Sequence, residues 1–565
     1  MKKLIIILML SIFFNSDSNA QTLVRGPYLQ VNTSNSIVVR WDTDSTTDSR
    51  VYYGKNLNNL DMNEVLSDKV IKHKVKLTNL EPNTKYYYSV GDSSGILSAS
   101  EEAQHFYTAP IPGPESTDPI RIWAIGDFGK GNQGQKDVRD AYLNYLGDSL
   151  RTNVWLWLGD NAYDDGNEQE YSDKVFDETI YSSILKNMPF WPCPGNHDYN
   201  SVCPIICTEN PTHHEGVYYN IVSVPEDGEA GGTPSGLPLY YSFDYGNIHF
   251  ISLNSEIGSS VEDYDWTGIM STAGWNNSPM KAWLEEDLDQ NEQPWVIAFW
   301  HQVPFSKGSH DSDDQWELYM KGMRENVVPL LESYDVDMIL CGHSHVYERS
   351  YMIKGFYGSS GDFDSSVHVI NGLSGNPDLG EEYIKNVDLV GGNNGTMYVV
   401  SGNGGSSTSN PELNHPIMAA ADGGSSAYGS VVIEVSGNQL DLIYLKSDST
   451  IGDKFSIVKK GIPTSDGGAI SNPKEQSNLN QLKVFPHPFT DYANVYYSLN
   501  KETDVQVELL DITGKKISTV FEGTLPAGPQ NHYINSNSLG ISKGMYLVTV
   551  NDGNETKIEK IVKVE

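Results

Sequence analysis

Five short segments of the chain end an apolar run with a side chain of a type that binds metals. They read RIWAIGDFG (121–129), VWLWLGDNAYDDG (154–166), FWPCPGNHD (190–198), WVIAFWHQ (295–302) and DMILCGHSH (337–345). A buried strand that ends in Asp, Asn or His presents these groups at the carboxyl edge of a sheet, where α/β proteins keep their sites. The recurrence of the pattern predicts one site assembled from several strand ends.

The polar residues of these segments form a coherent ligand set. Asp, Asn and His supply oxygen and nitrogen, which suit iron, zinc or manganese and not a thiolate site. Asp127 and Asp160 each offer a carboxylate, and one carboxylate can bridge two ions. His343 and His345 are two residues apart, so in an extended segment both imidazoles lie on one side and can reach different ions of a close pair. Tyr163 can approach the same site, and its phenol loses a proton readily only to a strongly acidic ion such as ferric iron.

Length and charge limit the class of protein. A chain of 565 residues predicts about two to four domains. The net charge of −36, from 38 basic and 74 acidic residues, disfavours a nucleic-acid binder and a protein that docks to anionic lipid. We therefore expect no nucleic-acid partner.

The N-terminus predicts export. Lys2 and Lys3 precede the apolar run 4–14, and Ser-Asn-Ala at 18–20 offers a cleavage site, so residues 1–20 read as a secretory signal peptide. No later stretch is long and apolar enough for a membrane span. In an oxidising compartment Cys203 and Cys207 offer a local disulfide, but four cysteines allow three pairings, and the sequence does not choose among them.

The order of secondary-structure signals predicts several domains. Residues 22–110 contain β-branched and aromatic runs typical of a small β-sandwich, including 36–42 and 50–54, and a Pro-rich linker follows at 109–119. From residue 120 strands alternate with helices, which predicts two mixed sheets packed face to face with helices outside, an α/β/β/α sandwich. We expect the helices at Gln133–Leu150, Gln169–Asn187, Pro279–Gln290 and Asp314–Tyr334, and a β-hairpin within 240–256 that turns at Gly246-Asn247.

At its five motifs the chain resembles the binuclear metallophosphoesterases, which carry the same motifs in the same order: GDFG, GDNAYDDG, GNHD, FWHQ and GHSH. Tyr163 in the second motif narrows the resemblance to the purple acid phosphatases. RGPYLQ (25–30) resembles the opening of their N-terminal domain, and LEPNTKYYYSV resembles fibronectin type III strands. The resemblance implies a fibronectin type III-like domain at 21–112 and a calcineurin-like metallophosphoesterase domain at 120–460.

The resemblance also implies a division of ligands between two ions, with Asp160 as the bridge. The ferric site would take Asp127, Asp160, Tyr163 and His345. The divalent site, for zinc, manganese or iron, would take Asp160, Asn196, His301 and His343.

Three further residues are implied to act on the substrate. His197 should face the phosphate, and Asp198, where the family usually has Glu, should orient it. His310 matches a substrate-facing His of the plant-type enzymes. The implied activity is that of a secreted acid phosphatase, in which a metal-bound hydroxide attacks small phosphate monoesters. The alternatives are a phosphodiesterase or nucleotide pyrophosphatase on the same metals, and a surface binding protein without activity.

The C-terminal part forms a separate region. A polar linker is expected at 461–480, and 481–565 reads as a small β-sandwich. Its VFPHPF start, DITGK turn and final GMYLV and KIVK strands resemble the sorting domain of type IX secretion cargo. An immunoglobulin-like adhesion module is the rival interpretation. The resemblance implies the secretion machinery as a partner and a route through the periplasm to the medium or the outer cell surface.

Overall fold

The structure is a computed structural model that describes residues 21–564 except for 103, 114–118, 148–149, 200–215, 257–270, 387–393, 410, 461–478, 486–488, 491, 500, 513–514, 527 and 554–555. The predicted signal peptide, Cys203, Cys207 and most of the predicted 461–480 linker lie outside the described residues. The chain forms two compact units, one of Met1–Glu381 with Thr396–Ser456 and the other of Glu382–Gly395 with Ile457–Glu565.

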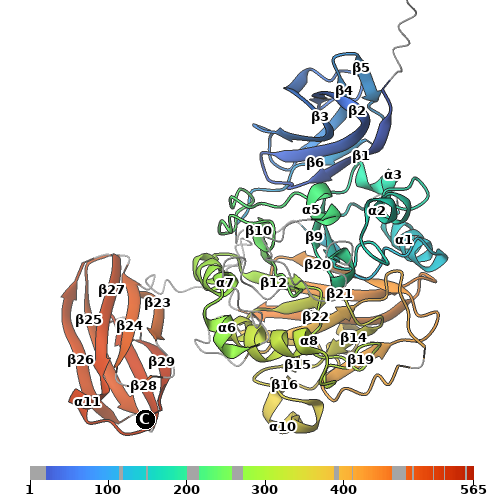
Figure 1. Ribbon diagram of the computed structural model, residues 1–565. Coiled ribbons are helices and arrows are strands. Elements are labelled where there is room, and N and C mark those ends of the chain that lie inside the picture. The colour runs from blue at the N-terminus through green and yellow to red at the C-terminus, as the bar shows by residue number, and fades with distance from the viewer. Residues whose placement is uncertain are drawn as a thin grey trace, which may run out of the picture. The chain divides into compact units, whose positions relative to one another are not determined.

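The N-terminal domain is an antiparallel β-structure of six strands (Figure 1). They are β1 (Leu23–Gln30), β2 (Ile37–Gly54), β3 (Met62–Leu77), β4 (Lys85–Asp92), β5 (Gly95–Ser98) and β6 (His105–Tyr107). The two strands expected at 36–42 and 50–54 are one long strand, β2. Buried polar residues in the middle of β2 have hydrogen-bond partners inside the domain: Thr47 donates to Asp92, and Ser49 contacts His73. The chain can therefore continue as a strand through this polar stretch and does not turn out to solvent.

Two seven-stranded sheets form the centre of the phosphoesterase-like part of the chain that follows residue 119. One has the order β17 (Tyr383–Asn386), β22 (Ile451–Lys460), β21 (Gln439–Lys446), β20 (Gly429–Ser436), β7 (Ile120–Ile125), β8 (Val154–Leu158) and β9 (Phe190–Cys193). The other has the order β10 (Tyr241–Tyr245), β11 (Ile248–Ser252), β12 (Trp295–Trp300), β13 (Met338–Cys341), β18 (Met397–Ser401), β14 (Tyr347–Ser350) and β19 (Met418–Asp422). The rings of Trp191 and Phe243, from facing sheets, stack with centroids 3.7 Å apart. The predicted face-to-face packing and the hairpin β10–β11 are confirmed.

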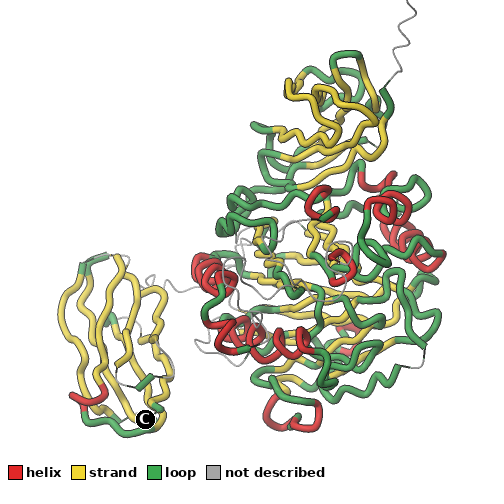
Figure 2. The backbone as a smooth tube through the Cα atoms, in the orientation of Figure 1, coloured by secondary structure: helices red, strands yellow, loops and turns green. Residues whose placement is uncertain are grey.

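Helices lie outside the sheets, as Figure 2 shows. In α1 (Gln133–Leu146) Tyr142 stacks on Trp123 of the first sheet, with ring centroids 4.1 Å apart, and α7 (Pro279–Gln290) buries Trp283 and Leu284 in the core of the second. Shorter helical elements complete the domain: α4 (Asn196–Tyr199), α5 (Val217–Ile221), α6 (Thr272–Asn276) and α10 (Ser365–His368).

Two predicted helices differ from the structure. The helix expected at 169–187 is divided into α2 (Glu168–Lys174) and α3 (Ser182–Leu185), because the Asp177 side chain accepts the Thr179 N–H and forms a turn between them. The helix expected at 314–334 consists of α8 (Leu318–Gly322), a π-helical turn at Met323–Val327 and α9 (Val328–Ser333). The irregular turn ends two residues before Pro329, which has no N–H for a regular helical bond.

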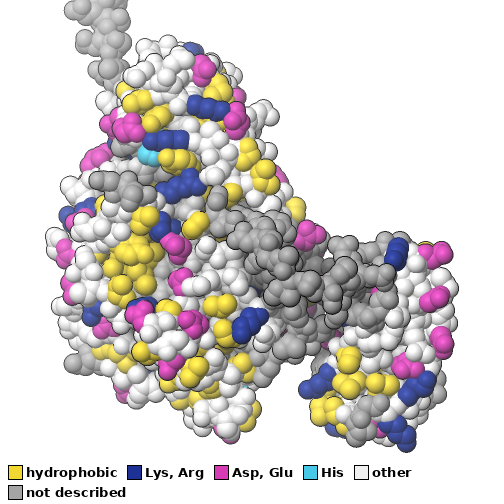
Figure 3. All heavy atoms as spheres, turned by 180° about the vertical axis from the view of Figure 1, so that it is seen from behind, with side chains coloured by type: hydrophobic (Ala, Val, Ile, Leu, Met, Phe, Trp, Pro, Cys, Tyr) yellow, Lys and Arg dark blue, Asp and Glu magenta, His cyan; other side chains and the backbone are white. Residues whose placement is uncertain are grey.

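The C-terminal domain contains a three-stranded and a four-stranded sheet, which share one core that includes Val495, Val507 and Val548. The strands are β23 (Leu479–Phe485), β24 (Tyr492–Leu499), β27 (Gly528–Asn535), β26 (Lys516–Leu525), β25 (Thr503–Asp511), β28 (Gly544–Asn551) and β29 (Thr556–Lys563). Within the described ranges no helix has the length and apolar character needed to cross a membrane. On the face shown in Figure 3, acidic and basic side chains are interspersed among neutral and apolar ones.

Candidate metal centre

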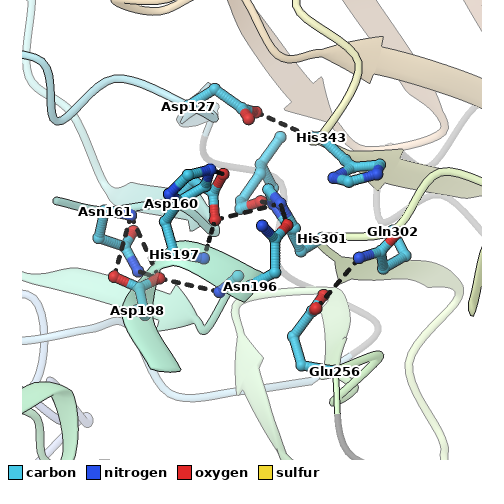
Figure 4. Close-up of polar contacts among 12 residues, drawn as sticks. Asp127, Asp160, Asn161, Asn196, His197, Asp198, Glu256, His301, Gln302 and His343 are labelled. Atoms are coloured by element: carbon cyan, nitrogen blue, oxygen red, sulfur yellow. Dashed lines mark hydrogen bonds and ion pairs between the residues drawn. The ribbon is translucent and has the colours of Figure 1, made fainter. Parts of the chain in front are cut away.

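The carboxyl ends of strands from both sheets deliver the predicted ligands to one place. Strands β7, β8 and β9 are parallel neighbours, and Asp127, Asp160 and Asn196 follow them closely. Strands β12 and β13 are parallel neighbours in the other sheet, and His301 and His343 follow them. Figure 4 shows these five side chains gathered around a common space. Residues far apart in the sequence therefore meet because their strands share one edge of each sheet.

Glycines in the motifs allow the ligand loops to approach one another. A Cβ atom on Gly195 would lie 2.3 Å from the backbone nitrogen of Asp160, and one on Gly342 would lie 2.5 Å from Oδ2 of Asp127. Any larger residue would displace the neighbouring ligand. This contact explains why Gly precedes Asn196 and His343 in these motifs.

Three of the predicted ligands have an uncommon backbone conformation. The φ angles of Asp127, Asp160 and His343 are +55°, +52° and +67°, in the left-handed region that non-glycine residues seldom occupy. Such conformations cost on the order of 1–3 kcal/mol each and cluster at functional sites. The Asp127 carboxylate accepts the backbone N–H of His343 at 2.8 Å, which ties two of these turns together.

One half of the site contains Tyr163, Asp127 and His345. The Tyr163 hydroxyl donates to Oδ1 of Asp127 at 2.9 Å and lies 3.2 Å from Nε2 of His345. That Nε2 is 3.4 Å from the same Asp127 oxygen. Burial raises the pKa of Tyr163 well above its usual value, and Asp127 and Asp160 raise it further. The phenol therefore keeps its proton unless a strong cation replaces it.

The other half is built around Asp160 and His301. Nε2 of His301 lies 3.3 Å from Oδ1 of Asp160 and 3.2 Å from Oδ1 of Asn196. Nδ1 of His301 donates to the carbonyl of Leu158 at 2.9 Å, which directs Nε2 toward these oxygens. Burial acts to raise the pKa of Asp160, but His301 and His197 outweigh burial and hold that pKa below its usual range.

The donor atoms of this site fit metal ions. Ligand atoms of Asp127, Asp160 and His301 all lie within 4.8 Å of one another, and all three residues are buried. Burial lowers the pKa of His343 to about 4, so its imidazole is neutral, and among the described residues its buried Nε2 has no hydrogen-bond partner. Buried carboxylates and an unpartnered imidazole nitrogen are groups that a bound cation would satisfy. Two carboxylates, an amide, imidazoles and a phenol are suitable ligands for iron, zinc or manganese.

His197 lies beside both halves of the site. Its ring packs against Tyr163, with centroids 4.3 Å apart, and its Nδ1 is 2.5 Å from the carbonyl oxygen of Asp164. Its Nε2 is 3.9 Å from Oδ2 of Asp160. A carbonyl oxygen can only accept a hydrogen bond, so Nδ1 of His197 carries the hydrogen that it donates to Asp164. Nε2, the other ring nitrogen of His197, faces the centre of the site.

Asp198 makes contacts other than the expected one. Its buried carboxylate accepts hydrogen bonds from the Asn161 side chain at 2.9 Å, the Gly195 backbone at 2.8 Å and the Tyr171 hydroxyl at 2.5 Å. Burial and Asp160 raise the pKa of Asp198 to about 6. In these contacts Asp198 holds the two ligand loops together and the Asp164 carbonyl contacts the His197 imidazole, while an orienting role of Asp198 toward His197 stays a prediction.

His310 lies beside the predicted divalent half. Its ring stacks on His343, with centroids 3.9 Å apart, and its Nδ1 is 2.6 Å from Oε1 of Glu317. All ten residues predicted for the site thus lie in one region or directly beside it.

Three charged residues at the site were not predicted from the sequence. Lys130 places its Nζ 3.3 Å above the ring centre of Tyr163, Glu317 contacts His310, and buried Glu256 accepts the Gln302 amide at 3.0 Å. Burial raises the pKa of Glu256 to about 7. Lys130 directly follows GDFG, and that position could have revealed it, whereas the two glutamates stand outside every motif.

Comparison with known families agrees with the geometry of the site. The calcineurin-like phosphoesterase model matches residues 120–347, the purple acid phosphatase N-terminal domain matches 24–108, and the secretion system C-terminal sorting domain matches 483–564.

Similar proteins include two from Arabidopsis thaliana. Purple acid phosphatase 15 is 28% identical to this chain over 328 residues, which cover 54% of each protein. Purple acid phosphatase 23 is 28% identical over 324 residues, which cover 54% of this chain and 63% of the relative. The match thus spans about half to two thirds of these relatives. A purple acid phosphatase from seeds of yellow lupin (Lupinus luteus) shares the fold, with a TM-score of 0.56 and 20% identity over 79% of this chain and 78% of that one.

Proposed function

The chain is a purple acid phosphatase-like metallophosphoesterase with a secretion sorting domain, and from this premise we propose that it is an acid phosphatase that hydrolyses small phosphate monoesters at a binuclear metal centre. The observation that carries the proposal is the position of Asp160. Its carboxylate lies among the His301 and Asn196 donors of one half, and its ligand atom is within 4.8 Å of that of Asp127 in the other half. A carboxylate in that position is suited to bridge two ions.

The proposed ligands follow the two halves of the site. Asp127, Tyr163, His345 and Asp160 would hold a ferric ion, and Asp160, Asn196, His301 and His343 would hold divalent zinc, manganese or iron. The bound pair would supply positive charge to the phosphoryl oxygens and acidify the attacking water. In the reaction, a water oxygen bonds to phosphorus, the phosphorus–oxygen ester bond breaks, and the leaving oxygen takes up a proton.

Two histidines are proposed to serve the substrate directly. His197, held at Nδ1 by the Asp164 carbonyl, directs Nε2 into the site, where a protonated imidazole donates a hydrogen bond to a phosphoryl oxygen or a proton to the leaving oxygen. The His310 ring stacks on His343, a proposed ligand of the divalent half, and supplies a second imidazole near that half of the site.

The test is a comparison of substrates with metal analysis. Purified mature protein supplied with iron and with zinc or manganese should contain two ions per chain and hydrolyse p-nitrophenyl phosphate much faster than bis(p-nitrophenyl) phosphate. Faster turnover of the diester would instead indicate a phosphodiesterase or nucleotide pyrophosphatase. A fully metallated protein that turns over neither substrate would indicate the binding-protein alternative.

The sorting domain indicates a secreted or cell-surface protein. We propose that the signal peptide first directs the chain to the periplasm, and that the type IX machinery then moves it across the outer membrane through recognition of the C-terminal domain. Cell fractionation with antibody detection tests this route.

A further inference from the structure

A second group of ligand-type side chains adjoins the proposed divalent half. Ligand atoms of His310, Glu317 and His343 all lie within 4.8 Å of one another. Only His343 belongs to the ligand set proposed above. Glu317 lies outside all five sequence motifs, so the fold alone brings its carboxylate to this position.

The Glu317 side chain is directed to the histidines and not to its own helix. Glu317 occupies the N-cap position of α8, and its side chain makes no capping hydrogen bond to that helix. Its Oε1 accepts from Nδ1 of His310 at 2.6 Å, and the His310 ring is itself stacked on His343. One carboxylate oxygen is therefore held in place, and the other, Oε2, faces Nε2 of His343.

The separation between Glu317 and His343 leaves a position for a cation. Oε2 lies 3.7 Å from the buried Nε2 of His343, which is too long for a hydrogen bond. Within the described part of the chain, that Nε2 has no hydrogen-bond partner. An imidazole nitrogen and a carboxylate oxygen that face each other at this separation can both bind one cation placed between them. A divalent ion bound by His343 would therefore also face Glu317.

We propose that Glu317 is an additional carboxylate ligand of the divalent half, held by His310 and facing the ion shared with His343. The inference rests on the proposed function, because His343 must bind a metal. With Asp160 and Glu317 the divalent half has two carboxylates beside its amide and imidazoles, and carboxylate oxygen favours Mn²⁺ relative to Zn²⁺. A Glu317 ligand would therefore shift the metal preference of the divalent half toward Mn²⁺.

The experiment is a metal titration of the purified, metal-free mature chain by calorimetry, with Mn²⁺ and with Zn²⁺ separately. The variants are Glu317→Gln, Glu317→Asp and the control Asp314→Asn, which alters an exposed carboxylate three residues earlier that accepts the Trp316 N–H. Glu317→Gln should weaken Mn²⁺ binding at the divalent site at least about tenfold and Zn²⁺ binding less. Glu317→Asp should recover part of the Mn²⁺ affinity, and Asp314→Asn should bind both ions as the wild type does.

The outcomes separate this inference from the proposed function. A wild-type chain that does not bind two ions refutes the metal centre itself. A wild-type chain that binds two ions, with unchanged Mn²⁺ and Zn²⁺ affinities in Glu317→Gln, refutes only the role of Glu317. Equal loss of both metals together with a lower unfolding temperature indicates a structural role and also overturns the inference.

Discussion

Asp160 is the residue on which both halves of the proposed centre depend. It is almost fully buried, it accepts the backbone N–H of His197 at 2.9 Å, and it lies 3.3 Å from His301. Its backbone occupies the left-handed region, and Gly195 packs against it so closely that no side chain fits between them. A residue under such constraint tolerates little change in position.

Replacement of Asp160 by Ala should remove at least one metal ion and lower phosphatase activity more than about 100-fold, because both ions lose a shared anionic ligand. Elemental analysis of the purified variant and the rate of p-nitrophenyl phosphate hydrolysis measure these effects. Full metal content with activity close to that of the wild type would contradict the assignment of the whole ligand set.

Tyr163→Phe tests the identity of the metal in the other half. A phenolate bound to ferric iron gives a broad charge-transfer band in the visible spectrum, so the wild-type protein should be purple or pink and the variant colourless. The ring packing against His197 is retained, and the fold should survive. Activity should fall only in part, because Tyr163 is proposed to bind a metal and not the phosphate. A colourless, oxidised, fully metallated and active wild-type protein would refute the iron–phenolate proposal and leave the two-metal hydrolase intact.

At the scale of elements, a buried histidine outside the proposed ligand set joins a helix to the second sheet. His249 of β11 lies 2.8 Å from Asp244 of β10 and 2.8 Å from Asp287 of α7. Asp287 also accepts the hydroxyl of Ser242 and the backbone N–H of Thr233. Burial acts to lower the pKa of His249, but Asp287 and Asp244 outweigh burial and raise that pKa to about 9. The imidazolium is therefore part of the native packing of α7.

This raised pKa predicts a pH dependence of stability. The stabilisation by His249 is fully present below its ordinary pKa of 6.5 and is lost as pH rises through about 9. The loss should be on the order of 3 kcal/mol. We expect His249→Gln to be less stable than the wild type at pH 6.5 and to lose less stability between pH 6.5 and 9. Urea unfolding of both proteins across this range is the measurement, and two parallel stability curves would contradict the prediction.

At the scale of the whole molecule, the N-terminal domain is attached to the phosphoesterase domain by buried arginines. Arg40 donates to the carbonyl of Val222 at 2.7 Å, and Arg25 donates to Ser172 of α2 at 2.9 Å and pairs with Glu168 at 2.6 Å. The C-terminal domain belongs to the other compact unit, which also contains Glu382–Gly395. Every proposed metal ligand lies in the first unit.

Removal of residues 480–565 should therefore leave a soluble enzyme with the metal content and specific activity of the full chain. In the native host the shortened protein should remain in the periplasm, because the sorting domain is absent. Activity assays on purified protein and fractionation of host cells test the two parts separately. Loss of metals would contradict the proposed domain division, and arrival of the shortened protein at the cell surface would contradict the sorting role.

The sequence by itself determined the order of the motifs and the class of fold. Each motif is local: a few apolar residues form a strand, and the next residues place Asp, Asn or His at its end. The spacing of His343 and His345, the hairpin turn at Gly246 and the start of α7 at Pro279 are likewise set by neighbouring residues. Such features depend on short-range geometry, and the sequence therefore predicts them. Their chemical roles stay predictions until metal binding is measured.

Only the tertiary structure decided which partners these residues meet. Asp198 is adjacent to His197 in the sequence but binds Asn161 and Tyr171, because the chain turns at α4 and its carboxylate faces the neighbouring loop. Glu317 belongs to no motif, yet the fold brings it to His343. Contacts across such separations follow from the packing of whole strands and helices, and no local pattern of apolar and polar residues records them.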